Sequence, residues 1–327
     1  MTSAGVWTRA YRSGSVVDEG FEVAGVAAHL ADADTVVWVD VCAPADGDLG
    51  ELAALLGLHP LAVEDALGPH QRPKIDRYPG HLFLACHAVQ VDAAVGRLHL
   101  TEVDAFVGPR WLVSVRKDDR FDLAPVLARL DGASELAHGG VGFILHGLLD
   151  AAVDTYFDAV LDFDTYYDDV SDGLFADVPL NPTEQRHWFH MRRSLVHLHR
   201  VVAPLREVVS SLVRGEHHGI DDALVPYFVD LYDHVLRVSE SIDSLRDLAT
   251  SIVEANLSLR DYRQNLVMKK ITSWAGILAV PTLVTGFYGM NVPFPGQGTV
   301  TGAVTATVFM LVPSAVLFLV FRRREWL

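Results

Sequence analysis

The most informative absence in this sequence is charge, because residues 271–321 contain no Asp, Glu, Lys, Arg or His. A helix that crosses a bilayer needs roughly 20 predominantly apolar residues, so this stretch has room for two spans and a short turn. We predict spans over 271–287 and 301–321, joined by a loop over 289–300. A buried helical hairpin of a soluble protein is the alternative, which the uninterrupted length disfavours.

Basic residues bracket the uncharged stretch at both ends. Lys269 and Lys270 precede it, and the tail 322–327 begins with three arginines. Because cytoplasmic flanks of membrane spans are enriched in Lys and Arg, this pattern predicts that both chain ends are cytoplasmic and the loop is external. We therefore expect a multi-pass protein of the cell (inner) membrane.

Other absences exclude several classes of protein. The first residues lack a basic region followed by an apolar run, so we expect no secretory signal and a cytoplasmic large domain. A formal net charge of -16 argues against nucleic acid as a partner and is compatible with cations. No phosphate-binding Gly-rich loop is visible, and none of the 15 histidines has a convincing metal or triad context, so we expect neither an organic cofactor nor an enzyme.

Cysteine is also scarce, with only Cys42 and Cys86 in the chain. Both lie in apolar, strand-like runs, which favours small core residues over a disulfide or a metal pair.

Residues 1–135 are typical of an α/β domain. The β-branched and apolar runs predict strands over 35–41, 81–91, 98–107 and 111–115, the last two joined by a turn at 108–110. Short helices are expected over 49–56, 61–67 and 121–130. A small mixed sheet with helices packed on it is the simplest architecture for these elements.

Residues 136–222 predict a helical hairpin, with helices over 143–175 and 183–213. The first helix carries Asp150, Asp154, Asp158 and Asp162 at four-residue steps, which places the carboxylates along one face. This stripe is interpreted as a solvated face, with diffuse attraction of cations as the alternative.

Residues 223–288 predict one long stalk helix that continues into the first span. The chain has no Gly or Pro between Pro226 and Gly276, and a helix over 226–287 would be roughly 90 Å long. Residues at heptad spacing, all apolar except Asn256, predict the seam of a helix that packs along another helix, formed by Val235, Val238, Ile242, Leu245, Ala249, Ile252, Asn256 and Leu259. Such a rod would couple the cytoplasmic domain mechanically to the membrane.

The sequence Tyr288-Gly289-Met290-Asn291, at the end of the first of two C-terminal spans, resembles the CorA family of magnesium transport proteins. Further matching segments follow in the family's order, and the resemblance extends over about 50–327. These segments are His59 to Asp65, His70 to Lys74, Val202 to Leu212, and Pro226-Tyr227-Phe228 with the residues up to His234. The resemblance implies an α+β cytoplasmic domain with long helices, followed by two C-terminal transmembrane helices, assembled as the CorA funnel.

The resemblance also implies a function, a passive Mg²⁺ channel driven by the membrane potential. Two spans cannot enclose a pore, so transport requires several chains, and the family implies a homopentamer. Gly289, Met290 and Asn291 would form the selectivity filter. The family's pore-lining positions correspond to Asn265, Met268, Ile271 and Thr282. For Met268 and Ile271, ordinary packing between helices is the alternative.

Regulation by cytosolic Mg²⁺ is a further implication of the resemblance. The family senses this ion through carboxylates at the protomer interface, and Asp92 and Asp230 match those positions. His234, one turn after Asp230, is a candidate additional ligand. As lone surface carboxylates, either Asp could instead be simply solvated.

The external loop departs from the family pattern. Many relatives carry a carboxylate after the triplet, whereas residues 292–298 contain none. This leaves Co²⁺, Ni²⁺ and Zn²⁺ open as alternative cargo, although the zinc-transporting ZntB branch usually alters the triplet that is intact here. A membrane-anchored cytoplasmic sensor or scaffold is the alternative of another class.

Overall fold

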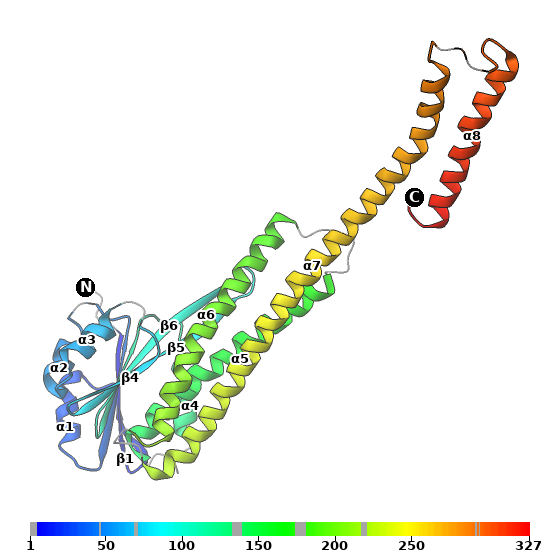
Figure 1. Cartoon of the computed structure of the whole chain (residues 1–327). Coiled ribbons are helices and arrows are strands. Elements are labelled where there is room, and N and C mark those ends of the chain that lie inside the picture. The colour runs from blue at the N-terminus through cyan, green and yellow to red at the C-terminus, as the bar shows by residue number, and fades with distance from the viewer. Residues whose placement is uncertain are drawn as a thin grey trace. The chain divides into compact units, whose positions relative to one another are not determined.

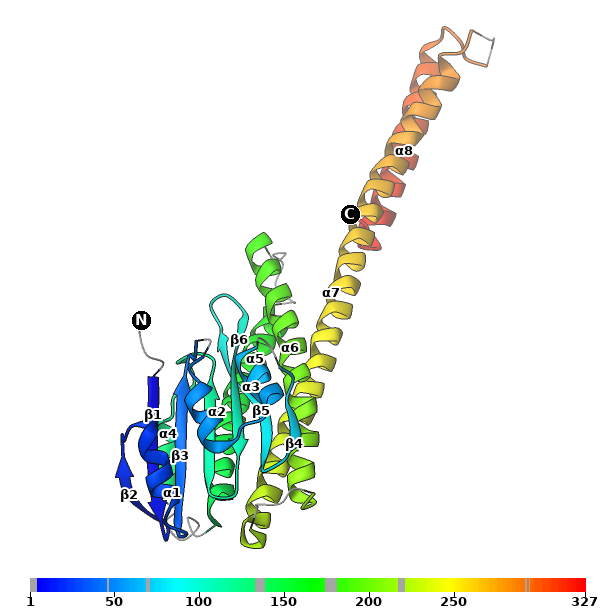
Figure 2. The same cartoon turned by 90° about the vertical axis from the view of Figure 1, so that its left-hand side faces the viewer.

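The computed structural model describes residues 5–45, 47–68, 71–132, 139–173, 181–216, 221–291, 293 and 295–327. The chain divides into two compact units, Met1–Ala249 and Thr250–Leu327. Figures 1 and 2 show the elements of both units from two directions. The helix α7 (Val225–Tyr288) runs without a break from the first unit into the second.

The first unit contains a seven-stranded sheet with the order β2-β1-β3-β7-β6-β5-β4. Its strands are β1 (Gly5–Arg12), β2 (Ser15–Glu19), β3 (Thr35–Cys42), β4 (Lys74–Tyr78), β5 (His81–Asp92), β6 (Arg97–Val107) and β7 (Trp111–Arg116). Strands β3 and β7 pair in parallel, and every other described pair is antiparallel. The sheet is therefore mixed, as the sequence predicts.

The four predicted strands are confirmed as β3, β5, β6 and β7, whereas β1, β2 and β4 were not predicted. The missed strands lie at or next to the edges of the sheet. Strand β2 is exposed along its whole length, and β4 has no fully buried residue. Edge strands face water on more than one side, so they lack the long apolar run that identifies a buried strand.

Helices cover both faces of the sheet (Figure 1). On one face lie α1 (Val26–Leu30), α2 (Gly50–Leu56) and α3 (Pro60–Leu67), and their side chains share a core with Val39, Phe83 and Phe106. On the other face lie α4 (Ala124–Gly132) and α5 (Val141–Gly173). There the buried Tyr156 hydroxyl of α5 donates a hydrogen bond of 2.6 Å to the His87 carbonyl of β5.

The predicted helical hairpin is confirmed as α5 and α6 (Pro182–Val213), whereas residues 174–180 between them lie outside the described residues. Asn181 caps α6, because its side chain accepts hydrogen bonds from the backbone N–H groups of Thr183 and Glu184. The Glu184 carboxylate in turn accepts from the Asn181 N–H at 2.8 Å. This reciprocal pair is a capping box, which fixes where the helix begins.

The predicted seam of α7 is correct as far as Ile252, and all six residues up to that point are buried. It is wrong for its last two members, because Asn256 is exposed and Leu259 is only half-buried. Both belong to the second unit, where α8 (Val300–Arg323) is the only other described helix. Heptad spacing identifies a face suited to helix packing, but burial also needs a neighbouring helix of the same chain.

The cysteine prediction is correct for Cys86, which is buried, and only partly correct for Cys42, which is half-buried. Both thiols are free.

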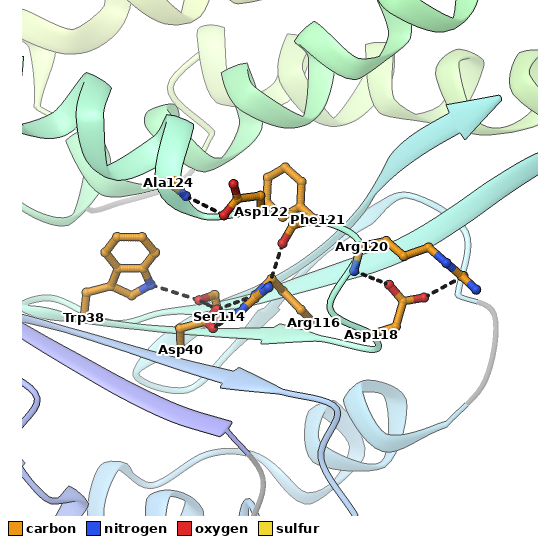
Figure 3. Close-up of polar contacts among 9 residues, drawn as sticks. All are labelled: Trp38, Asp40, Ser114, Arg116, Asp118, Arg120, Phe121, Asp122 and Ala124. Atoms are coloured by element: carbon orange, nitrogen blue, oxygen red, sulfur yellow. Dashed lines mark hydrogen bonds and ion pairs between the residues drawn. The ribbon is translucent and has the colours of Figure 1, made fainter. Parts of the chain in front are cut away.

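A buried ion pair joins β3 to β7, the parallel strand pair (Figure 3). Asp40 is fully buried, and its carboxylate accepts hydrogen bonds from the Arg116 guanidinium at 2.7 and 3.1 Å. Ser114 donates to Asp40 at 2.6 Å and accepts from the Trp38 indole at 2.9 Å. Arg116 also donates to the Phe121 carbonyl, so the network continues into the segment before α4.

Substituting Arg116 by Met leaves the Asp40 carboxylate buried without its cation. We expect the free energy of unfolding to fall by about 3–5 kcal/mol, which is the usual cost of removing one partner of a buried pair. Arg120→Met is the matched control, because Arg120 is half-exposed where it meets Asp118. Such surface pairs contribute about 0–1 kcal/mol. Urea denaturation of the detergent-solubilised full chain, followed by tryptophan fluorescence, measures both changes; equal midpoints for the two variants would contradict this role of Asp40.

The second unit contains the C-terminal part of α7 and helix α8. By length and composition, two helical segments could cross a membrane, Asp222–Tyr288 and Val300–Arg323. Thr299 caps α8 by accepting a hydrogen bond from the Gly302 N–H. A side chain at Gly302 would clash with the Gly296 carbonyl. Glycine at this position therefore permits the close return of the loop onto α8.

Candidate ion pathway and regulatory carboxylates

One face of the apolar part of α7 packs against α8. Buried or half-buried positions recur every three or four residues, namely Leu266, Lys269, Ser273, Gly276, Ile277, Val280 and Val284. Within this set, Ser273 is fully buried, and Gly276 lies near the Phe321 ring of α8, 3.7 Å from the position of a Cβ atom. The remaining faces of α7 are thus free of α8.

The four predicted pore-lining residues are all exposed in the single chain. Ile271 lies two residues from both Lys269 and Ser273, and Thr282 lies two residues from both Val280 and Val284. Two residues correspond to about 200° around a helix, so Ile271 and Thr282 lie opposite the α8 face. Met268 is 56% exposed and Asn265 lies one turn before it, so both continue the row toward the N-terminal end of the helix.

Leu278 lies on the same face and was missed by the sequence interpretation. It is 63% exposed, and it lies seven residues after Ile271 and four before Thr282. The spacing of four, three and four residues from Ile271 through Ala275 and Leu278 to Thr282 could have identified Leu278 from the sequence. Gly286 continues the same row by one further turn toward Gly289.

The hydroxyl of Thr282 is oriented to accept hydrogen bonds. It donates its proton to the Leu278 carbonyl at 2.8 Å, so its oxygen lone pairs remain available. The hydration shell of a cation presents O–H donors outward, so such an oxygen is complementary to a hydrated cation. Thr285 makes the equivalent bond to the carbonyl of Pro281, at 2.9 Å.

The triplet Gly289-Met290-Asn291 directly follows the C-terminus of α7. The Gly289 N–H donates to the Thr285 carbonyl at 2.9 Å, so the glycine still completes the last helical turn. A Cβ atom at Gly289 would lie 3.0 Å from that carbonyl, which is tighter than an ordinary contact. Met290 and Asn291 are exposed. Of the loop that follows, Val292 and Phe294 lie outside the described residues.

Asp92 ends β5 and closes the turn into β6. Its Oδ1 accepts hydrogen bonds from the N–H groups of Ala94 and Val95, at 3.1 and 3.2 Å. The next turn residue, Gly96, has φ +74° and packs tightly against His187 at the start of α6. Asp92 therefore has a structural role in the turn through Oδ1, while its Oδ2 forms no hydrogen bond or ion pair within the described residues.

Asp230 lies at the start of α7, and its side chain is 69% exposed. The His234 imidazole lies 3.7 Å from Asp230 and, on its other side, 3.8 Å from Asp150 of α5. Arg129 of α4 binds Asp150 at 2.7 Å and Asp154 at 2.7 Å. The acidic stripe of α5 is thus not wholly solvated, because Arg129 pairs with its first two members.

The described chain does not bring Asp92 and Asp230 together. The β5–β6 turn packs near the start of α6, through Gly96 and His187. The start of α7 instead packs near the start of α5, where the His146 Nε2 donates a hydrogen bond of 3.2 Å to the Tyr227 carbonyl. Because α5 and α6 are antiparallel, these are opposite ends of the helix pair. Within the described residues, no group of three or more His, Cys, Asp or Glu side chains is arranged to hold a metal ion.

These elements define a class of membrane protein with an α/β domain and two apolar helices. One long helix, α7, begins at the α/β domain, and its C-terminal part is the first of the two apolar helices. The family model described as "CorA-like Mg2+ transporter protein" matches residues 33–323. The chain belongs to this family, and it is therefore a divalent-cation transporter rather than an enzyme.

Individual relatives agree with this assignment. The chain is 30% identical over 257 residues to the putative metal ion transporter YfjQ of Bacillus subtilis, covering 79% of each chain. It is 28% identical over 301 residues to the cobalt/magnesium transport protein CorA of Thermotoga maritima, covering 90% of this chain and 85% of that protein. The complete structure of the CorA magnesium transporter from Methanocaldococcus jannaschii shares the fold, with a TM-score of 0.78, 21% identity and full coverage of both chains.

Proposed function

We propose that this protein is a homopentameric channel for the passive uptake of hydrated Mg²⁺. The observation that carries the proposal is the exposed face of α7 opposite α8. That face runs through Ile271, Leu278 and Thr282 and ends at the Gly289-Met290-Asn291 turn. One chain cannot enclose a path with a single helix face, whereas several copies around an axis would line one with it.

The outer mouth would recognise the ion through its water shell. Mg²⁺ gives up its water reluctantly, so a selective site should hydrogen-bond to the bound water with neutral oxygens. The Asn291 amide and the Gly289 carbonyl supply such oxygens, and a ring of Thr282 hydroxyls would repeat this contact deeper in the path.

An apolar segment would close the path. When several copies surround the path, Met268, Ile271 and Leu278 would each contribute one ring of apolar side chains to its wall. Apolar constrictions close pores by excluding water. Asn265 would place a polar ring at the cytoplasmic end. This arrangement separates ion recognition at Asn291 from closure at the apolar rings.

The membrane potential would supply the driving force. We place both chain ends in the cytoplasm of a cell (inner) membrane, because Lys269–Lys270 and Arg322–Arg324 flank the spans on one side. A charge crossing a membrane gains about 2.3 kcal/mol per 100 mV, so a divalent cation gains about 4.6 kcal/mol.

Cytosolic Mg²⁺ would close the channel through Asp92 and Asp230. Their separation within one chain supports a site shared between neighbouring copies, with Asp92 of one copy facing Asp230 of the next. Without the ion, the facing carboxylates repel each other; with it, they are held together and the closed state is favoured. His234 is the candidate additional ligand, because it already lies beside Asp230.

The cargo is proposed as Mg²⁺ from the intact triplet, with Co²⁺, Ni²⁺ and Zn²⁺ as alternatives. Two of the relatives are named cobalt/magnesium transport proteins. The external loop has no carboxylate that would concentrate cations at the mouth. Competition between these ions for uptake into liposomes would rank them.

Uptake of Mg²⁺ into liposomes that contain the purified full-length protein tests the proposal. We expect uptake well above that of empty liposomes, without added nucleotide. A membrane-anchored scaffold of the same fold would give none.

A further inference from the structure

Basic side chains are concentrated in the second unit, next to its two apolar helices. Residues 264–327 contain five basic side chains and one acidic one, Glu325, which leaves an excess of four positive charges. The whole chain, in contrast, has a net charge of -16. The five basic residues are Lys269, Lys270, Arg322, Arg323 and Arg324. We call these five residues the inner basic cluster.

The packing of α7 on α8 brings both parts of the inner basic cluster to the same end of the helix pair. Gly276 of α7 lies near the Phe321 ring of α8. Lys269 lies seven residues, or about two turns, before Gly276, on the side of α7 that faces α8. Residues 322–324 directly follow Phe321. In both views the C-terminus lies beside α7 (Figures 1 and 2).

The chain turns back on itself after α8. Glu325 has φ +57°, and the Trp326 N–H donates a hydrogen bond of 3.0 Å to the Phe321 carbonyl. The Trp326 ring stacks on the Phe321 ring, with 5.6 Å between centroids and 10° between planes. The tail is thus held against the end of α8, with three exposed arginines next to an indole ring.

The inner basic cluster has no anionic partner among the described residues. None of its five side chains forms an ion pair or a hydrogen bond there, and all are exposed except the half-buried Lys269. The C-terminus of α8 supplies a partial negative charge of about half an elementary charge. This partial charge and Glu325 together offset less than half of the five positive charges. The cluster is therefore suited to a bound anion.

We propose that the inner basic cluster, together with Trp326, binds the phosphate group of an anionic phospholipid. The proposal rests on the membrane placement made under the proposed function, in which this end of the helices meets the cytoplasmic leaflet. Anionic lipids of that leaflet attract basic residues close to its surface. The planar guanidinium of arginine can bind phosphate through two parallel hydrogen bonds, and an indole ring is suited to the headgroup level.

A phospholipid fits the surroundings of the cluster better than a free anion does. Leu319 and Val320, in the turn of α8 that precedes the arginines, are 57% and 42% exposed. The acyl chains of a bound lipid would cover these side chains while its phosphate meets the arginines. Inorganic phosphate would contact the cations alone and would leave the apolar side chains uncovered.

Native mass spectrometry of the purified full-length protein tests the proposal. The protein is titrated with phosphatidylglycerol and with phosphatidylcholine of the same acyl chains. We expect the apparent Kd for phosphatidylglycerol to be lower by about tenfold or more, and inorganic phosphate in excess to leave this binding unchanged. Equal affinity for the two lipids would overturn the proposal. Displacement of the lipid by inorganic phosphate would assign the cluster to a free anion instead.

Glutamine at all three arginines should remove most of this preference. We expect Arg322→Gln with Arg323→Gln and Arg324→Gln to lower the preference for phosphatidylglycerol to about twofold or less, because three charges near the surface are lost. Lysine at the same three positions keeps the charges and should keep at least half of the parent's preference. Arg237→Gln is the control, since Arg237 is an exposed arginine of α7 in the first unit. An unchanged preference in the triple glutamine variant would contradict the site.

The three arginines also help to orient the spans, so a second variant leaves them in place. Lys269→Gln with Lys270→Gln removes the α7 part of the cluster only. We expect this pair to weaken the preference for phosphatidylglycerol by about threefold or more. No change in the preference would exclude α7 from the site and would overturn the proposed cluster.

Tryptophan fluorescence provides a measurement that locates the lipid. Phosphatidylglycerol with brominated acyl chains quenches nearby indole rings, and Trp326 is one of six tryptophans in the chain. Trp326→Phe keeps an aromatic ring for stacking on Phe321 but removes this indole. We expect a smaller quenched fraction in the variant than in the parent. Equal quenched fractions would place the bound lipid away from Trp326 and overturn the assigned site.

The outcomes separate the lipid site from the transport function. Selective binding of phosphatidylglycerol that depends on the inner basic cluster, without Mg²⁺ uptake by the parent, would support the lipid site and overturn the transport function. Mg²⁺ uptake by the parent, with equal binding of the two lipids, would overturn the lipid site alone.

Discussion

Asn291→Ala should reduce Mg²⁺ uptake into liposomes at least tenfold. The substitution removes one amide from each copy at the proposed mouth, where the oxygen would accept hydrogen bonds from the ion's water shell. A hydrogen bond of this kind contributes about 0.5–1.5 kcal/mol, and each 1.4 kcal/mol corresponds to a factor of ten. Because the ring would lose several such bonds together, tenfold is a lower bound. Initial rates of uptake, followed with a Mg²⁺ indicator enclosed in the liposomes, measure the change.

Gln297→Ala is the matched control for this experiment. Gln297 is an exposed amide in the same loop, six residues after Asn291 and outside the triplet. We expect its loss to leave uptake within about twofold of the parent. Equal uptake by Asn291→Ala and the parent would show that the amide ring does not select the ion.

The double substitution Asp92→Asn and Asp230→Asn should weaken closure by Mg²⁺. The parent should become resistant to protease as Mg²⁺ increases, because the ion would join the carboxylates of neighbouring copies. The amide variants carry no charge to neutralise, so we expect at least a tenfold higher Mg²⁺ concentration for half-maximal protection. The same variant should continue to transport at internal Mg²⁺ concentrations that close the parent.

Glu240→Gln is the control for this pair. Glu240 is an exposed acid on α7, about three turns beyond Asp230, and the proposed site does not include it. Its removal changes the net charge of each copy without touching the site. If the double variant and the control were protected at the same Mg²⁺ concentration, the regulatory assignment of Asp92 and Asp230 would be wrong.

The parts of the fold that could be predicted from the sequence are the elements with a long, uninterrupted residue pattern, either a continuous apolar run or a helical spacing of apolar residues. The buried strands β3, β5, β6 and β7 have continuous apolar runs, and α7 has an unbroken helical pattern from Val225 to Tyr288. Strands β2 and β4 lack such a run because they lie at the sheet edges. The predicted seam of α7 extends too far, to Leu259, because spacing alone does not show where the neighbouring helix ends.

The candidate site could be predicted only in part, for a similar reason. The triplet and the row that contains Met268, Ile271 and Thr282 depend on local spacing along one helix. Leu278 belongs to that row by the same spacing, and the packing of Ser273 and Gly276 shows that this row faces away from α8. The contact of Arg129 with Asp150 and Asp154 joins residues distant in sequence, and no local pattern predicts it.

The most direct test of passive, potential-driven transport is the distribution of Mg²⁺ across liposomes that contain the parent protein, held at a fixed membrane potential without nucleotide. At an inside-negative potential of 100 mV, a divalent cation gains about 4.6 kcal/mol on entry. We expect Mg²⁺ to enter against its concentration gradient toward a ratio of roughly 2,000-fold, and to leave when the potential is reversed. Uptake that ignored the sign of the potential, or no uptake at all, would contradict the account.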